Sequence, residues 1–216
     1  MSFDARRFIL ENTSILSPPH VPEVRLHLAS EAHELWHKTE EQLAQTGLQP
    51  PVWAFAWAGG QGLARYVLDH PQTVRGRKVL DFASGSGLVG IAAMLAGAAE
   101  VTCADIDPFA AQAVLLNAQI SAVALNTSQE NLIGSAVDAP VLLAGDVFYD
   151  RQTALELTPW FELLAAGGTE ILIGDPGRTY LPKQRLEQLA VYEVPVTKAL
   201  EDADVKRTTV WRFLSA

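Results

Sequence analysis

Short apolar runs alternate with segments of helical periodicity through the middle of the chain. The apolar runs predict strands at about 78–82, 100–105, 139–144 and 169–174. Each run is nearly all apolar, as a strand covered on both faces requires. Helices are predicted between them at about 88–96, 108–120 and 153–165. This alternation indicates an α/β fold with a mostly parallel sheet.

The pattern changes at both ends of the chain. Residues 189–196 and 207–214 read as strands without a long helix between them, so a closing antiparallel pair is predicted. Residues 1–75 precede the strand predicted at about 78–82 and are expected to form an N-terminal extension, with a helix at about 61–68. The extension is expected to pack on a domain of residues 76–216, the whole forming one structural domain.

One segment of the extension matches a metal-binding pattern. Ser30 predicts the start of a helix that runs to about Thr46, and His33-Glu34-Leu35-Trp36-His37 within it has the H-E-x-x-H spacing of zinc proteases. No obvious third ligand follows, and too few residues precede the segment to form the usual supporting sheet. We therefore expect a surface helix and no metal site.

Composition narrows the function classes. The 216 residues are 49% apolar and carry a net charge of −9 without a basic cluster, which disfavours nucleic acid as a partner. The single cysteine, Cys103, excludes a disulfide within the chain and is expected to serve packing. No segment reads as a signal peptide or a membrane span, so the expected location is the cytoplasm.

A glycine-bearing turn provides the strongest chemical signal. The strand that ends at Asp81 leads into Ala83-Ser84-Gly85-Ser86-Gly87, and the next strand ends at a second carboxylate, Asp105. Gly85 and Gly87 allow the backbone to approach a ligand closely. An acid about 18–20 residues beyond such a turn can accept hydrogen bonds from both ribose hydroxyls. The sequence therefore predicts a site for a nucleoside-bearing cofactor.

Two cofactors compete for this site. Gly85–Gly90 has the G-x-G-x-x-G spacing of dinucleotide-binding proteins, which would make the chain an NAD(P)-dependent oxidoreductase. However, the carboxylate of Asp81 would repel a pyrophosphate and suits the positive charges of S-adenosyl-L-methionine (SAM). The motif also begins late in the chain, and Asp105 is followed by Ile106-Asp107-Pro108. These features favour SAM.

Asp146 and Tyr149 follow the fourth predicted strand. They are expected at the carboxyl edge of the sheet, where a carboxylate and a phenol could hold a substrate amine. A free lysine of pKa about 10.4 is only about one part in a thousand neutral at pH 7.4, so the site must help remove a proton and then align the amine. The alternative is a helix N-cap for Asp146 and rim packing for Tyr149.

Two further segments are candidates. Trp53, Phe55 and Trp57 lie in a loop where Trp57 could cover the cofactor or line a channel for an alkyl-ammonium, whereas core packing is an equal alternative for Trp53. Asp175-Pro176-Gly177-Arg178 predicts a turn after the last parallel strand, with Arg178 paired to a site carboxylate.

Together, Val79–Gly90, Cys103–Asn117 and Gly145–Tyr149 resemble the seven-strand SAM-dependent methyltransferases that carry a D-x-x-Y motif. With Pro51–Trp57 and Gly174–Arg178 added, the chain looks most like the electron transfer flavoprotein β-subunit lysine methyltransferases. The resemblance implies a Rossmann-like, three-layer fold with strand order 3-2-1-4-5-7-6 and one antiparallel strand. It also implies methylation of lysines beside the recognition loop of the flavoprotein β-subunit.

The resemblance assigns Asp146 and Tyr149 to the target lysine. The expected cofactor-binding residues are Trp57, Asp81, Ala83, Gly85, Gly87, Asp105, Ile106 and Asp146. Ala83 stands where the general motif has glycine. Other proteins, ribosomal ones among them, and small molecules remain alternative methyl acceptors, and a non-catalytic SAM-binding module remains a further alternative.

Overall fold

The computed structural model describes residues 4–29, 50–196 and 203–215. The helix predicted from Ser30 and the H-E-x-x-H segment lie outside these ranges. A seven-stranded sheet of order β5-β4-β3-β6-β7-β9-β8 forms the centre. Its strands are β3 (Lys78–Phe82), β4 (Glu100–Ala104), β5 (Asn126–Ser128), β6 (Val141–Gly145), β7 (Glu170–Asp175), β8 (Leu186–Pro195) and β9 (Val205–Phe213).

The strand order confirms the predicted topology, because it corresponds to 3-2-1-4-5-7-6 when the seven strands are counted along the chain. The five strands β3 to β7 pair in parallel. Strand β9 runs antiparallel to both of its neighbours, β7 and β8. The predicted closing antiparallel pair is thus also confirmed.

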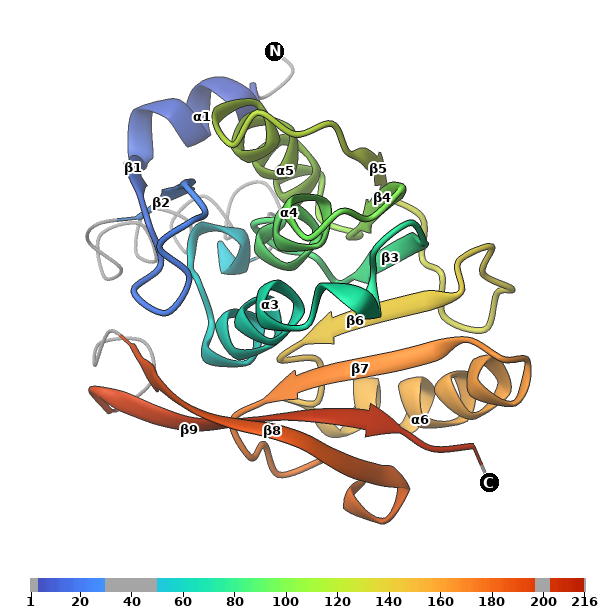
Figure 1. Ribbon diagram of the computed structural model, residues 1–216. Helices are drawn as coiled ribbons and strands as arrows, with labels where there is room; N and C mark the ends of the chain where they lie inside the picture. Colours follow the sequence, from blue (N-terminus) through green and yellow to red (C-terminus); the bar gives the residue numbers. More distant parts are fainter. Residues whose placement is uncertain (1–3, 30–49, 197–202, 216) are drawn as a thin grey trace.

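Helices cover both faces of the sheet, which gives the predicted three layers (Figure 1). On one face lie α3 (Ala58–Asp69), α4 (Leu88–Leu95) and α5 (Pro108–Ile120). On the other face lies α6 (Arg151–Ala166), with the segment 129–140 beside it. Short 3₁₀ helices occur at Val52–Ala54, Pro71–Thr73 and Lys183–Arg185. None of the helices in the described part of the chain is long and apolar enough to cross a membrane.

The apolar runs form the buried strands that they predict: β3 has the predicted bounds, and the ends of β4, β6 and β7 are shifted by at most two residues. Strand β5 was not predicted, because its three residues, Asn126–Ser128, are polar and lie at the sheet edge, where no apolar run is needed. Three elements of the extension were also missed: α1 (Ala5–Asn12), β1 (Ser14–Leu16) and β2 (Leu26–Leu28).

The extension packs on α5 through aromatic side chains. The ring of Trp53 is only 1% exposed and stacks on Phe109 with centroids 6.0 Å apart, while Phe8 meets Phe109 edge-on at 5.6 Å. Such contacts bury large apolar areas and stabilise the docking of one segment on another. Of the two interpretations of Trp53, core packing is the one that the structure confirms.

Candidate active site

The turns that follow β3, β4, β6 and β7 meet at one edge of the sheet, because these strands are parallel (Figure 1). Ligands of open α/β sheets bind at this carboxyl edge. All of the predicted site residues except Trp57 lie at the ends of β3, β4 and β6 or in the turns that follow these strands, and Trp57 immediately precedes α3. The topology therefore brings the predicted residues to one region.

The turn after β3 has a backbone that favours glycine at three positions. Gly85 and Gly87 have φ values of +51° and +77°, and Ala83 has φ +53°, which strains an L-residue. A Cβ added at Gly85 would meet nothing closer than the Trp53 Cα at 3.8 Å. The turn thus bends sharply, and at Gly85 a Cβ would make only ordinary van der Waals contact.

Asp105 lies against this turn. One carboxylate oxygen accepts a hydrogen bond from the Gly85 amide at 2.9 Å, and the other accepts one from the Asp107 amide at 3.0 Å. Burial raises the pKa of Asp105, although both hydrogen bonds oppose the rise. The next residue, Ile106, is 66% exposed and so presents an apolar side chain to solvent beside the acid.

Two buried polar atoms near the turn have no hydrogen-bond partner among the described residues: Ser84 Oγ and Asp107 Oδ2. The other Asp107 oxygen caps α5 by accepting from the Phe109 amide at 2.8 Å. Burial, with the nearby Asp105 charge, raises the pKa of Asp107 to about 6. Such orphaned atoms beside this turn fit a polar ligand, and the acids fit one that carries hydroxyl groups and positive charge, as SAM does.

Asp81 is fully buried beneath the start of α4. Its carboxylate accepts a hydrogen bond from the Gly90 amide at 2.8 Å and faces the Cys103 thiol, 3.7 Å from Sγ. Burial raises the pKa of Asp81 to about 7 and that of the Cys103 thiol well above its usual range. In this arrangement, Asp81 fixes the helix that follows the glycine turn.

Asp146 connects three elements. It has φ +58°, and its amide donates to the Gly174 carbonyl at 2.9 Å. Its carboxylate accepts hydrogen bonds from Arg178 Nη2 at 2.7 Å and from the Gly60 amide at 3.0 Å. The predicted pairing of Arg178 with a site carboxylate is confirmed. The N-cap of α6 is Asp150, not Asp146.

Glycines bring α3 unusually close to β6 and β7. A Cβ on Gly59 would lie 2.3 Å from the Gly174 carbonyl oxygen and 2.5 Å from the Asp146 carboxylate. A Cβ on Gly145 would lie 2.8 Å from the Gly60 Cα. The sequence reasoning missed this contact, because nothing local marks which distant glycines will face one another.

Tyr149 and Trp57, the two aromatic residues of the predicted site, each have their own surroundings at this edge. Tyr149 is 65% exposed, and the pKa of its phenol is raised by partial desolvation and by the Asp150 carboxylate. The Trp57 indole donates to the Val52 carbonyl at 2.9 Å and packs edge-on against Phe55. Both aromatic residues therefore retain accessible surface near the turns.

Asn117 is a structural residue whose role the sequence did not reveal. Its buried amide group donates to the Ser86 carbonyl at 2.8 Å and accepts from the His27 amide at 2.7 Å. The glycine turn is thereby tied through α5 to β2 of the extension. The only available signal was an asparagine within an apolar helix, which indicates a satisfied buried amide but not its partners.

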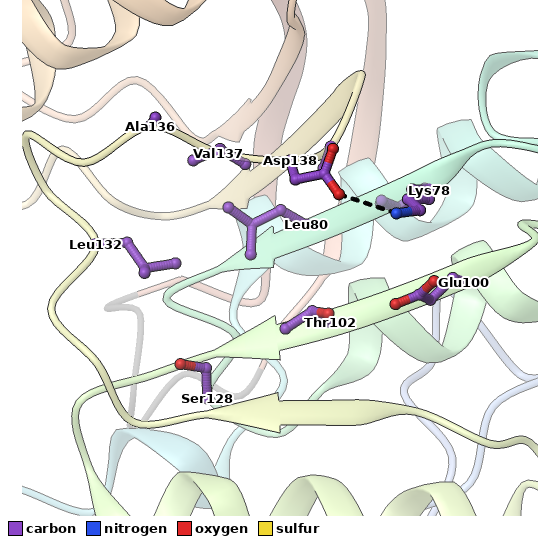
Figure 2. Close-up of a pocket in the computed structure, with 11 residues that line it drawn as sticks. Lys78, Leu80, Glu100, Thr102, Ser128, Leu132, Ala136, Val137 and Asp138 are labelled. Carbon is purple, nitrogen blue, oxygen red and sulfur yellow. Dashed lines mark hydrogen bonds and ion pairs between the residues drawn. The ribbon is translucent and has the colours of Figure 1, made fainter.

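A pocket of about 270 Å³ extends along β3 and β4 from Lys78 and Glu100, at the starts of these strands, to Ser128 at the end of β5. Figure 2 shows Lys78 and Glu100, which begin β3 and β4, on its wall, with Lys78 paired to Asp138 at 2.9 Å. None of the predicted site residues is among the residues that line this pocket. Within the described ranges, no three side chains are grouped so that they could hold a metal ion.

Comparison with known proteins identifies close relatives. The chain is 38% identical over 218 residues to the electron transfer flavoprotein beta subunit lysine methyltransferase of Xenopus laevis, covering 96% of this chain and 86% of the relative. It is 33% identical to the human protein of the same name, covering 97% and 82%. Residues 65–145 match the family described as ribosomal protein L11 methyltransferase (PrmA).

Solved structures agree on the fold. Ribosomal protein L11 methylase from Lactobacillus delbrueckii superposes with a TM-score of 0.53 at 18% identity, over 79% of this chain and 83% of that one. Magnesium protoporphyrin IX methyltransferase from Synechocystis, solved with bound SAM, gives 0.57 at 12% identity, over 85% and 94%. At these identities the likeness shows a Rossmann-like methyltransferase fold.

Proposed function

The chain belongs to the electron transfer flavoprotein β-subunit lysine methyltransferase family, and we propose that it methylates lysine ε-amino groups of that β-subunit with SAM as the methyl donor. The observation that carries the proposal is the 38% identity to a relative of that name across 96% of the chain. The acidic net charge of −9 also suits a lysine-bearing protein better than nucleic acid.

The cofactor half of the proposal rests on the turn after β3. SAM supplies a methyl group on a positively charged sulfonium. Asp105 would hold the ribose hydroxyls, exchanging its hydrogen bond from the Gly85 amide for stronger, charge-assisted ones. Gly85 and Gly87 would line the methionine end, and Trp57 and Ile106 would cover apolar parts of the cofactor.

The lysine half rests on the edge beside β6. The target amine must lose a proton before it has a lone pair to offer. Tyr149 is neutral at physiological pH, as a phenol ordinarily is, and its raised pKa keeps it so. Its oxygen can therefore accept a hydrogen bond from the amine N–H and direct the lone pair. The carboxylates at this edge attract the incoming ammonium, and the proton leaves to solvent past the exposed Tyr149.

Ribosomal proteins are the second candidate class of substrate. The match to the ribosomal protein L11 methyltransferase family covers residues 65–145, which hold the glycine turn and Asp105. That segment supports the cofactor and says nothing of the acceptor. It does not extend to Tyr149 or Arg178, so we rank this substrate below the flavoprotein.

The test is transfer of labelled methyl from SAM to purified electron transfer flavoprotein and, in parallel, to a cell extract. We expect label on the β-subunit with the wild type. Asp105→Asn should bind S-adenosylhomocysteine about 10- to 100-fold more weakly in calorimetry, because charge-assisted hydrogen bonds are lost. Asp138→Asn, which changes an exposed acid far from the turn, is the matched control and should bind normally.

The outcomes separate the parts of the proposal. Label on a different extract protein would retain the enzyme class and exclude the flavoprotein. Equal binding by Asp105→Asn and Asp138→Asn would exclude the assigned cofactor site. Absence of label with intact cofactor binding would favour a small-molecule acceptor or a non-catalytic module.

A further inference from the structure

Arg178 comes from the turn after β7 and reaches across to the end of β6. Its Nη2 lies 2.7 Å from Asp146 Oδ1, and the two side chains are only 25% and 10% exposed. The turn that carries it is fixed by Asp175, which accepts hydrogen bonds from the Gly177 and Arg178 amides, both at 2.7 Å. The guanidinium is therefore held at the site by backbone geometry as well as by its partner.

The second oxygen of Asp146 binds the first turn of α3. It accepts from the Gly60 amide at 3.0 Å, and the N-cap residue of α3, Trp57, provides no side-chain cap of its own. A helix start carries partial positive charge and favours an anion. The Asp146 carboxylate is thus held between a guanidinium and a helix start, and both of its oxygens accept hydrogen bonds from the protein.

This arrangement matters for an amine acceptor. A carboxylate that can turn toward a substrate ammonium stabilises the charged form, which has no lone pair for methyl transfer. Because Arg178 and the Gly60 amide already bind both oxygens of Asp146, this carboxylate does not turn to form an ion pair with the substrate ammonium. It contributes only its electric field at the site. The same contact fixes the end of β6, from which the chain leads to Tyr149.

We propose that Arg178 is a positioning residue for methyl transfer, which holds Asp146 on the start of α3 and keeps its carboxylate from ion pairing with the substrate ammonium. The proposal rests on the proposed function, because it requires a lysine acceptor. It assigns to Arg178 no contact with substrate or cofactor.

The kinetic test compares Arg178→Met with Arg178→Lys, the double variant Arg178→Met/Asp146→Asn, and Arg65→Met. Arg65 also forms a half-buried ion pair, with Glu23 and Asp69, but at the far part of α3, so it is the matched control. Arg178→Met should lower kcat about 10- to 100-fold without raising KM for the lysine-bearing protein. Lysine at position 178 should recover part of the loss, because it keeps the charge.

The double variant distinguishes positioning from stability. Asparagine at position 146 cannot trap an ammonium as an ion pair, so kcat of the double variant should exceed that of Arg178→Met. A kcat no higher than that of Arg178→Met, an equal loss in Arg65→Met, or a higher KM with kcat unchanged would each overturn the proposal.

Hydrogen exchange gives a readout that does not depend on activity. In Arg178→Met, the Gly60 amide should exchange faster, because its acceptor is no longer held, while amides of β6 such as Leu142 should not change. Unchanged exchange at Gly60 would show that Arg178 does not hold Asp146 on the start of α3. If the wild type fails to methylate the flavoprotein, the proposed function fails, and the exchange result still decides whether Arg178 holds Asp146.

Discussion

Strands β3 and β6 are paired neighbours in the sheet, yet glycine serves different purposes at their carboxyl ends. After β3, Gly85 has a positive φ, and a Cβ there would make only ordinary van der Waals contact, 3.8 Å from the Trp53 Cα. At the end of β6, Gly145 leaves no space, because a Cβ would lie 2.8 Å from the Gly60 Cα. The first glycine serves the conformation of a turn, whereas the second allows two backbones to touch.

The acids at these two strand ends also differ, in the groups that surround their carboxylates. Asp81 is buried among neutral donors, the Gly90 amide and the Cys103 thiol, and the pKa of Asp81 rises to about 7. Asp146 is buried against a cation, Arg178, and a helix start. The two carboxylates therefore have different donors, which are neutral at Asp81 and include a cation at Asp146.

Gly59 and Gly60 are adjacent, and their alanine variants should differ most in the free energy of unfolding. Gly59→Ala should lower the free energy of unfolding by about 3 kcal/mol or more, because its Cβ would overlap the Gly174 carbonyl oxygen and the Asp146 carboxylate. Gly60→Ala is the control: its Cβ would meet only Val89 Cγ2 at 4.0 Å, so it should be neutral or up to about 1 kcal/mol stabilising. Urea unfolding measures both, and similar losses would contradict the contact.

Asp81 should make stability depend on pH. A carboxyl whose folded pKa is raised binds its proton more tightly in the folded state, so its contribution is greatest near pH 4 and is lost as pH rises to about 7. Asp81→Asn keeps the shape and removes this titration. The unfolding free energy of the wild type minus that of the variant should therefore fall by roughly 3 kcal/mol between pH 4 and pH 7.

Other groups titrate in the same range, so the comparison with the variant is essential. Burial also raises the pKa of Asp107 and lowers that of His20 and His27, and these effects cancel when wild type and variant are subtracted. A difference that stays flat between pH 4 and pH 7 would contradict the raised pKa of Asp81.

Ala83 should give the smallest effect. It has φ +53° in the turn after β3, so Ala83→Gly relieves local strain while adding entropy to the unfolded chain. We expect a stabilisation of up to about 1 kcal/mol by urea unfolding, with unchanged affinity for S-adenosylhomocysteine. A loss of affinity would instead assign the Ala83 methyl group to the cofactor surface.

The sequence predicted those parts of the fold that apolar runs determine. Strands β3, β4, β6 and β7 were found because each is buried on both faces, and β5 was missed because its three edge residues are polar. At the site, the sequence predicted that Arg178 pairs with a site carboxylate, and the structure identifies that carboxylate as Asp146. The Gly59–Gly174 contact was not, since it depends on how a helix crosses strands far away in the chain.

Asn117 shows that the extension, residues 1–75, and the domain of residues 76–216 are not structurally independent. Its side chain joins Ser86, in the turn after β3, to His27, in the extension. Helix α3, which also precedes residue 76, rests directly on β6 and β7. A chain shortened to residues 76–216 would leave both the turn and the sheet edge incomplete. Transplanting the proposed site onto another scaffold would therefore require β2 and α3 of the extension as well.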